Sequence, residues 1–210
     1  MAEPAIDNRY AAWIGRQEIL HDAVEPGAVR RMLATLDDVD AKLAPGDPVP
    51  PLWHWLAFLP EAPESALGAD GHPEGVDIRP PIDLPRRMFA GADFRFHAPM
   101  PIGAPLRRVA TVAAVQEKQG RSGRLVFMTV RHQVFHGQEL CVEEAIHSVH
   151  RDLAAPTAEP GAVAALAPLP PGAWSRTIVT DPVLLFRFSA LTFNGHRIHY
   201  DRPYATGVEG

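Results

Sequence analysis

Residues 106–151 read LRRVATVAAVQEKQGRSGRLVFMTVRHQVFHGQELCVEEAIHSVHR, and this stretch decides the fold class. It holds three runs rich in β-branched and aromatic residues, separated by short polar segments with glycine: 106–115, 125–135 and 140–149. Runs of this kind, joined by Gly-containing turns, are typical of consecutive hairpin strands. We therefore expect an antiparallel meander that reverses at 119–123 and again at 136–138.

The middle run of the meander differs from its neighbours. Its segment LVFMTV, residues 125–130, does not alternate between apolar and polar residues. A strand that is apolar on both faces is typical of a sheet interior covered on each side. We therefore expect this strand at the sheet centre, with cover on both faces.

Two adjacent carboxylates, Glu143 and Glu144, lie in the third run. Successive residues of a strand point to opposite faces of the sheet. The two side chains are therefore expected on different faces, with at least one in water. This placement argues against a paired-carboxylate catalytic site there.

Helical patterns precede the meander. Residues 28–38 are expected to form a helix because four apolar residues follow the i, i+3, i+4, i+7 spacing: Val29, Met32, Leu33 and Leu36. Residues 9–21 have a weaker pattern, which indicates a short amphipathic helix or a helix plus a turn, with Trp13 in the core. Residues 40–51 are rich in proline and predict an extended linker.

Large rings gather in residues 53–58, WHWLAF. Aromatic residues at alternate positions favour a short strand or a packed aromatic wall. Trp53 is a candidate for lining a ligand pocket. The alternative for these rings is core packing against the preceding helix.

Residues 60–85 are rich in Pro, Gly, Glu and Asp and have little periodicity. They predict a long surface excursion, and long loops of this kind often act as lids or binding loops. An arginine pair, Arg86 and Arg87, follows beside an apolar stretch. Such a pair could bind a phosphate through bidentate hydrogen bonds, or it could simply solvate a surface.

Residues 152–173 consist mainly of Ala, Pro and Gly, with hardly any charge. This composition is typical of an interdomain linker. We therefore expect one domain over residues 1–151 and the start of a second over residues 174–210.

The second part begins with a helix signal. Asp181 and Pro182 supply an N-cap and a first-turn proline for an apolar run, so we expect a helix buried on most sides. Asn194 and Gly195, which tolerate a left-handed backbone, are expected to end it.

Composition excludes several classes of protein. The chain has 210 residues, of which 46% are hydrophobic and 21% charged, as in an ordinary globular protein. A net charge of −5 without a Lys/Arg block argues against nucleic acid as a partner. The sequence has neither a leader pattern nor a long apolar run, so we expect a cytoplasmic protein without a membrane segment. The lone Cys141 excludes an intrachain disulfide and is expected to be a buried structural thiol.

Chemistry-bearing residues concentrate in residues 189–206, SALTFNGHRIHYDRPYAT. A His-rich turn of this kind can form an active site or a solvated loop. His196, His199 and Asp201 have the composition of a metal-ligand set. The two histidines, at i and i+3, could converge on one ion, but Asp201 is not a confident third ligand. We therefore expect no metal and no other cofactor. A Ser-His-Asp triad is disfavoured because the chain has no G-x-S-x-G elbow.

The string FRFSALTFNGHRIHYDRPYA, residues 186–205, strongly resembles the hydratase motif of MaoC-like hotdog hydratases, in the hydroxyacyl-thioester dehydratase type 2 subgroup. Further stretches resemble the same subgroup, which includes proteins similar to mesaconyl-C4-CoA hydratase: WIGRQE, APGDPVPPLWHWLAFLP, LPRRMFAGADFRFHAPMPIGAPLRR and EKQGRSGRLVFMTVRHQV. The resemblance implies an α+β double hotdog. Residues 1–151 would form a degenerate hotdog that holds the acyl chain and pantetheine, and the second hotdog would carry the motif.

The resemblance also implies roles for motif residues. Related (R)-specific enoyl-CoA hydratases have Asp, then Asn-Pro two and three positions later, then His five positions after the Asp. Laid over this chain, these positions hold Asn194, His196, Arg197 and His199. His199 would then act as the base and Asn194 would orient the water through its amide. His196 and Asp201 are candidates for support, Asp201 either by fixing a histidine ring or as a surface cap.

The implied activity is that of a hydro-lyase acting on an enoyl or 3-hydroxyacyl thioester of CoA or of acyl carrier protein. Arg86, Arg87 and Trp53 are candidates for substrate binding. The chain ends soon after the motif, so the resemblance leads us to expect an incomplete second hotdog and a homo-oligomer. The alternative function is a non-catalytic acyl-thioester-binding or assembly module.

Overall fold

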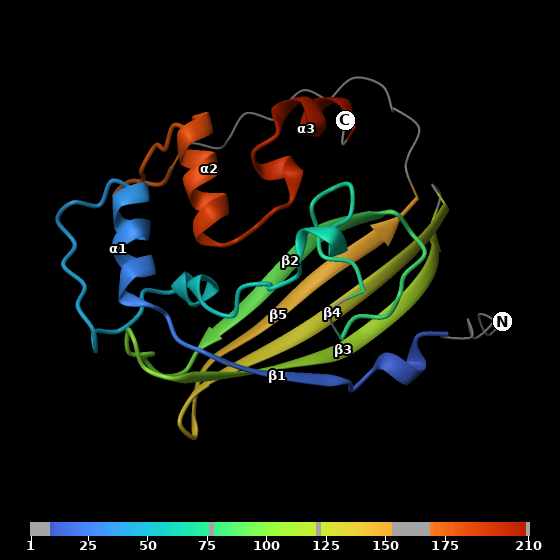
Figure 1. Cartoon of the computed structure of the whole chain (residues 1–210), viewed down its shortest axis with the longest axis horizontal. Coiled ribbons are helices and arrows are strands. Elements are labelled where there is room, and N and C mark those ends of the chain that lie inside the picture. Colours follow the sequence, from blue (N-terminus) through green and yellow to red (C-terminus); the bar gives the residue numbers. More distant parts are fainter. Residues whose placement is uncertain (1–8, 76–77, 121–122, 153–168, 209–210) are drawn as a thin grey trace.

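A computed structural model describes residues 9–75, 78–120, 123–152 and 169–208. Five antiparallel strands form one curved sheet in the order β1-β3-β4-β5-β2. Helices lie over one face of this sheet (Figure 1). The strands are β1 (Gln17–Asp22), β2 (Arg86–Phe96), β3 (Leu106–Gly120), β4 (Gly123–His136) and β5 (Glu139–Arg151).

The expected meander is confirmed as β3, β4 and β5. The second hairpin turns at Gly137, whose φ of +59° favours glycine, while the first turn lies partly outside the described residues. β4 is the central strand, as predicted, but the expected cover on both faces is wrong. Val126, Met128 and Val130 are buried, whereas Phe127 between them is 37% exposed. In the part of the chain that the structure describes, only the face beneath the helices is covered.

The predicted helix is α1 (Pro26–Thr35), which lies at one end of the sheet (Figure 1). Val29, Met32 and Leu33 of α1 belong to a buried core with residues of three strands, Leu106, Val134 and Val142. Cys141 is fully buried in the same core, as expected. An antiparallel sheet in the order β1-β3-β4-β5-β2, with helices packed on one face, confirms the α+β hotdog fold.

The N-terminal segment differs from its prediction. A 3-10 turn, η1 (Ala11–Trp13), is followed by Gly15 at φ +87° and then by β1, so no amphipathic helix forms over residues 9–21. Pairing of β1 with β3 satisfies its backbone groups, and this tertiary contact overrides a weak helical pattern. Trp13 is half-buried beneath the Arg16 guanidinium, 3.6 Å away, and is not a core residue.

The aromatic segment forms the 3-10 turn η2 (Trp53–Leu56), so the strand alternative is wrong. An aromatic wall does form, since the rings of His54 and Trp55 pack against Phe94 of β2. Residues 60–85 form the long excursion that the composition predicts, with one short turn, η3 (Glu64–Ala66), in its described part. This excursion crosses above the sheet, on the same side as the helices (Figure 1).

The C-terminal part begins at residue 169 in the structure, so most of the expected linker lies outside the described residues. The helix α2 (Pro182–Leu191) is capped as predicted, because the Asp181 carboxylate accepts a hydrogen bond from the Leu184 N–H at 2.8 Å. α2 lies beside α1. Among the described residues, no helix is long and apolar enough to span a membrane.

Two expectations for α2 are wrong. The helix is not buried on most sides, because only the side toward α1 is covered, and Val183 and Phe186 are 61% and 67% exposed. Its left-handed terminal residue is Phe193, at φ +47°, and not Asn194 or Gly195.

Candidate functional site

A cavity of about 1070 Å³ lies between the covered face of the sheet and the excursion that crosses it. Side chains of all five strands line it, together with the segment 58–63 and with His72, Pro73, Ile78 and Arg79 of the excursion. The cavity also reaches the C-terminal motif, where His196, Ile198 and His199 contribute to the lining. A hydrophobic floor with a few convergent polar groups is typical of ligand sites.

The motif forms a tight turn between α2 and α3 (Arg202–Gly207), with the 3-10 turn η4 (Arg197–His199) at its centre. The Asn194 amide oxygen accepts a hydrogen bond from the His196 N–H at 3.1 Å. The Tyr200 hydroxyl donates to the Gly195 carbonyl at 3.0 Å. These local bonds fix the direction in which the two motif histidines leave the backbone.

The excursion docks directly onto this turn. The Arg197 N–H donates to the Asp70 carbonyl at 2.9 Å, and the Arg197 guanidinium donates to the Ala69 carbonyl at 3.2 Å. The backbones approach so closely that a Cβ on Gly71 would lie 2.0 Å from the Gly195 carbonyl oxygen. Only glycine fits at position 71, which also has a φ of +86°.

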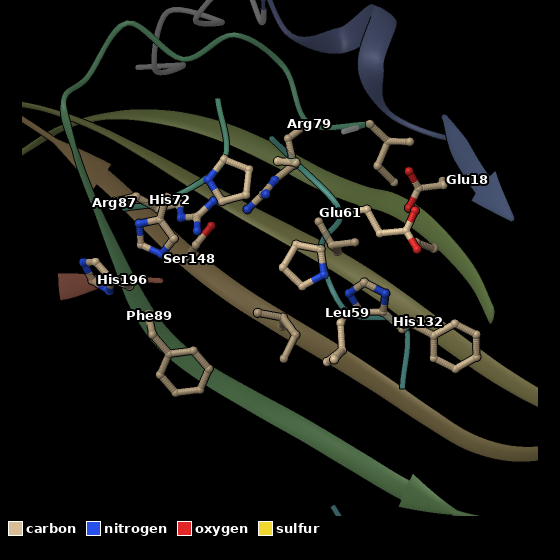
Figure 2. Close-up of a pocket in the computed structure, with 18 of the residues that line it drawn as sticks. Glu18, Leu59, Glu61, His72, Arg79, Arg87, Phe89, His132, Ser148 and His196 are labelled. Atoms are coloured by element: carbon tan, nitrogen blue, oxygen red, sulfur yellow. The ribbon is translucent and has the colours of Figure 1, made fainter. Parts of the chain in front are cut away.

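This docking brings a third histidine to the motif. His72 lies with its ring centroid 3.9 Å from that of His196, and the His196 and His199 centroids are 5.3 Å apart. The Asp70 carboxylate accepts a hydrogen bond from His72 Nδ1 at 2.8 Å. All three histidines line one end of the cavity, and Figure 2 shows His72 beside His196.

Two of the histidines at this end, His72 and His199, are neutral at pH 7. Burial, and then the charge of Arg87, lower the pKa of His72 to about 4, although the Asp70 hydrogen bond acts in the opposite direction. Burial acts to raise the pKa of Asp70, but its hydrogen bonds from His72 outweigh this and lower it. His199 is exposed as a residue, yet partial burial of its ring lowers its pKa. A neutral imidazole can accept a proton.

The other motif candidates have different positions. Asn194 does not contribute to the lining, and its amide oxygen is engaged by the turn. Of the two roles considered for Asp201, the structure favours the cap, because its carboxylate accepts from the Tyr204 N–H and pairs with Arg197 at 2.7 Å. No described hydrogen bond joins Asp201 to a histidine ring.

The candidate binding residues separate into two groups. Arg86 and Arg87, at the start of β2, both line the cavity. Trp53 does not line it and packs instead against the core around α1, which agrees with the core alternative.

Polar residues of the cavity floor were missed by the sequence reasoning. His132 of β4 and Ser148 of β5 line the cavity, and His150 of β5 is also buried on the covered side. In the pairing of β4 with β5, their side chains point to the same covered face as those of Val126, Met128 and Val130. The sequence did contain a signal for them: polar residues two positions from apolar residues of the same strand point to the same face as those residues. Asp70 and His72 had no such signal because the excursion lacks periodicity.

One group of side chains has the composition of a metal site. Asp70, His72 and His196 present ligand atoms that all lie within 4.8 Å of one another. The set considered from the sequence, His196, His199 and Asp201, does not converge in this way, because Asp201 is turned toward Arg197. Asp70 and His72 already satisfy each other by hydrogen bonding.

Comparison with known proteins matches residues 52–210 to the model of the family described as hydroxyacyl-thioester dehydratase type 2. The mesaconyl-C(4)-CoA hydratase of Chloroflexus aurantiacus is 49% identical over 203 residues, which cover 96% of this chain and 71% of that protein. The mitochondrial hydroxyacyl-thioester dehydratase type 2 of Schizosaccharomyces pombe is 25% identical, over 91% of this chain and 72% of that protein.

Among solved structures, HtdX of Mycobacterium tuberculosis aligns with a TM-score of 0.53 at 14% identity, over 91% of this chain and 66% of that chain. This likeness concerns the fold alone. The family match covers most of the chain, and the 49% identity to one relative extends over nearly all of it. The chain therefore belongs to the hydroxyacyl-thioester dehydratase type 2 family.

Proposed function

We propose that the protein is a hydro-lyase that adds water to, or removes it from, the α,β double bond of an enoyl or 3-hydroxyacyl thioester. The observation that carries this proposal is the position of His199. It belongs to the family motif and lines one end of a cavity of about 1070 Å³, a volume suited to an acyl group with part of its pantetheine arm. The names of the two relatives point to the same reaction class.

Hydration requires a base near the double bond. In the proposed step, an imidazole nitrogen of His199 takes a proton from water as the water oxygen bonds to the β-carbon. The π electrons move toward the thioester, and the protonated His199 then returns its proton to the α-carbon, so that H and OH have been added and the imidazole is neutral again. General-base catalysis of this kind contributes typically about 10²–10⁴-fold to a rate.

Other motif residues position this base. Asn194 acts in our proposal through the turn, since its amide oxygen holds the His196 backbone at 3.1 Å. His196 supports the site by packing edge-on against the His199 ring. Asp201 acts from further away, by capping α3 and holding Arg197, which in turn docks the excursion.

The substrate carrier that we propose is CoA, on the strength of the more similar relative, whose name specifies a CoA thioester. Acyl carrier protein is the second candidate, and the proposed reaction needs no cofactor. Arg86 and Arg87 are the binding candidates that line the cavity. The position of Trp53 in the core leaves it without a role in our proposal.

The organisation that we propose has a first hotdog over residues 1–151, a linker over 152–173 and the catalytic part of a second hotdog from 174. The exposed apolar residues of α2, such as Val183 and Phe186, support a homo-oligomer in which this helix is covered. A cytoplasmic location fits the free thiol of Cys141.

The test is turnover by the purified chain. Crotonyl-CoA and mesaconyl-C4-CoA each lose the ultraviolet absorbance of the conjugated enoyl thioester when they are hydrated. We expect loss of absorbance that scales with protein concentration for at least one of them. Tight binding of both without any loss of absorbance would instead identify a non-catalytic thioester-binding module.

A further inference from the structure

We infer that Asp70, His72 and His196 form a binding site for a divalent transition-metal ion, with Zn²⁺ as the expected occupant, and that the bound ion inhibits the enzyme. The site lies where the excursion docks onto the turn of the C-terminal motif, at the end of the cavity next to His199. It goes beyond the proposed function, because the hydration step needs no metal. The inhibition, but not the binding, rests on that function.

The three side chains come from two segments that are distant in sequence. Asp70 and His72 belong to the excursion and His196 to the motif turn, and the Arg197 N–H, which donates to the Asp70 carbonyl at 2.9 Å, joins the two segments. One ligand atom from each side chain lies within 4.8 Å of the other two. In the described part of the chain, no other three His, Cys, Asp or Glu side chains come this close together. Docking thus completes a ligand set that neither segment has alone.

The geometry of the set is close to that of a bound ion. The imidazoles of His72 and His196 lie side by side, with centroids 3.9 Å apart, and Figure 2 shows both at one end of the cavity. One Asp70 carboxylate oxygen lies 2.8 Å from His72 Nδ1. Ligand atoms around a tetrahedral zinc ion are about 3.3 Å apart, given bonds of about 2.0–2.1 Å. Small movements of these side chains would therefore bring all three atoms to one ion.

The composition of the set selects the class of ion. Imidazole nitrogens bind zinc and other transition metals, whereas Mg²⁺ and Ca²⁺ prefer oxygen ligands. A neutral imidazole carries one proton and leaves its other nitrogen for the ion. Two histidines and one carboxylate fill three positions of a tetrahedral zinc ion and leave the fourth for water or another ligand. We therefore expect the site to take Zn²⁺ and to reject Mg²⁺.

The charges around the site favour reversible binding. The Asp70 carboxylate supplies one negative charge, and its hydrogen bond orients the His72 ring, as carboxylates do for zinc-bound histidines. The positive charge of Arg87 acts on His72 and opposes a cation. Two carboxylates of the cavity lining, Glu18 and Glu61, lie at the opposite end in Figure 2. Because the ligand set holds a single carboxylate, the ion should exchange with solution.

An ion at this position would act on the proposed base. The His196 ring packs edge-on against the His199 ring, with centroids 5.3 Å apart. A positive charge beside an imidazole disfavours its protonation, so zinc on His196 would make His199 a weaker base. The ion and its water ligand would also take up space at the end of the cavity where hydration occurs. Zinc is therefore expected to inhibit turnover.

The test is zinc binding to the full chain without an affinity tag, measured by calorimetry in the absence of substrate. We expect one Zn²⁺ per chain, which excess Mg²⁺ does not displace. His72→Gln and Asp70→Asn should each weaken binding at least about 10-fold, the lower range for loss of a group that supports a metal. The matched control is His147→Gln, because His147 also pairs with a carboxylate, that of Asp93 at 3.0 Å, but does not line the cavity. This control should bind zinc like the wild type.

X-ray absorption spectroscopy of the wild-type zinc complex identifies the ligands directly, and it decides the question if a variant fails to fold by circular dichroism. We expect two imidazoles around the ion. Three results would overturn the site: no zinc binding, an affinity unchanged in both His72→Gln and Asp70→Asn, or a spectrum with fewer than two imidazoles.

Inhibition is tested separately, by hydration of crotonyl-CoA or mesaconyl-C4-CoA with and without zinc. The rate should fall when zinc is added and recover with EDTA, and His72→Gln should need at least about 10-fold more zinc for the same fractional loss. A zinc complex that turns over at the metal-free rate would contradict the inhibition. A chain that binds zinc as expected but never hydrates either substrate would refute the hydratase proposal and leave the metal site standing.

Discussion

Glu143 and Glu144 are neighbours on β5 that occupy opposite environments. Glu143 is half-exposed, whereas Glu144 is only 5% exposed and accepts a hydrogen bond from Trp55 Nε1 at 2.9 Å. His54 Nε2 lies 3.4 Å from the second oxygen of Glu144. Burial acts to raise the pKa of Glu144, but these partners outweigh burial and lower it. The buried carboxylate ties η2 to the sheet.

This contrast gives the first prediction. Glu144→Ala leaves buried His54 and the Trp55 Nε1–H without their acceptor, so we expect it to lower the free energy of unfolding by about 3 kcal/mol or more. Glu143→Ala, one residue away on the other face, should change it by less than about 0.5 kcal/mol. Urea denaturation of both variants measures the difference. Equal effects would show that burial of Glu144 does not stabilise the fold.

At the scale of elements, the excursion of residues 60–85 is held against the motif turn by backbone contacts. Asp70 and Ala69 accept from Arg197, and Gly71 lies against Gly195. The excursion thereby delivers His72 to the site. A loop without periodicity thus contributes as directly to the cavity as the strands do.

The second prediction tests this docking. Gly71→Ala introduces a methyl group where the Gly195 carbonyl lies 2.0 Å away, so the excursion must move off the turn. Gly75→Ala is the matched control, because Gly75 also has a positive φ, +67°, but has nothing within 4 Å of the added carbon. We expect Gly71→Ala to lower kcat/KM at least about 10-fold more than Gly75→Ala, since small misplacements of site groups are costly. A similar loss in both variants would mean that backbone strain, and not the close contact, matters.

The same elements show how far sequence reasoning reaches. The meander, α1 and the Asp181 cap were predictable because their signals are local: alternation, helical spacing and an Asp-Pro pair. β1 was missed because its hydrogen-bond partner, β3, is distant in sequence, and that pairing decides its conformation.

The site was predictable only in part. The motif identified His199 and His196, which line the cavity. Arg86 and Arg87 could be named, but which anion they face depends on the curvature of the sheet. Asp70 and His72 reach the site through a loop fold that no local pattern encodes. The left-handed residue at Phe193 likewise follows from the packing of the turn and not from residue preference.

At the scale of the whole molecule, one hydrophobic core lies around α1, and a second cluster includes Leu84, Val112 and Val126. The cavity lies on the same face of the sheet and includes neutral histidines. Burial lowers the pKa of His72 and His132, which line the cavity, and of His150, which is buried on the covered face, to about 4. These groups link global stability to pH.

The third prediction follows from the sign of these shifts. An unfolded histidine has a pKa of about 6.5, so between pH 6.5 and 4 the unfolded chain binds more protons than the folded one. Stability is therefore complete above pH 6.5 and falls as the pH drops toward 4, by up to about 1.4 kcal/mol per pH unit for each histidine. Urea midpoints at pH 7.0, 6.0 and 5.0 measure the slope.

A matched variant tests whether the buried histidines cause this dependence of stability on pH. His150→Gln removes one of the titrating groups from the covered face, so the decline between pH 6.5 and 5 should become shallower by about one proton. Replacing an exposed histidine, His21, by Gln should leave the slope unchanged. A midpoint that rises on acidification of the wild type would contradict the account of buried neutral histidines.

The central claim is that His199 is the base of an enoyl thioester hydratase, and single-turnover hydration of mesaconyl-C4-CoA tests it most directly. The rate of absorbance loss is compared between the wild type and His199→Ala, with unchanged circular dichroism as the control for folding. We predict that the variant is slower by at least about 100-fold, the lower range for loss of a general base. A variant that hydrates the substrate at the wild-type rate would contradict the claim.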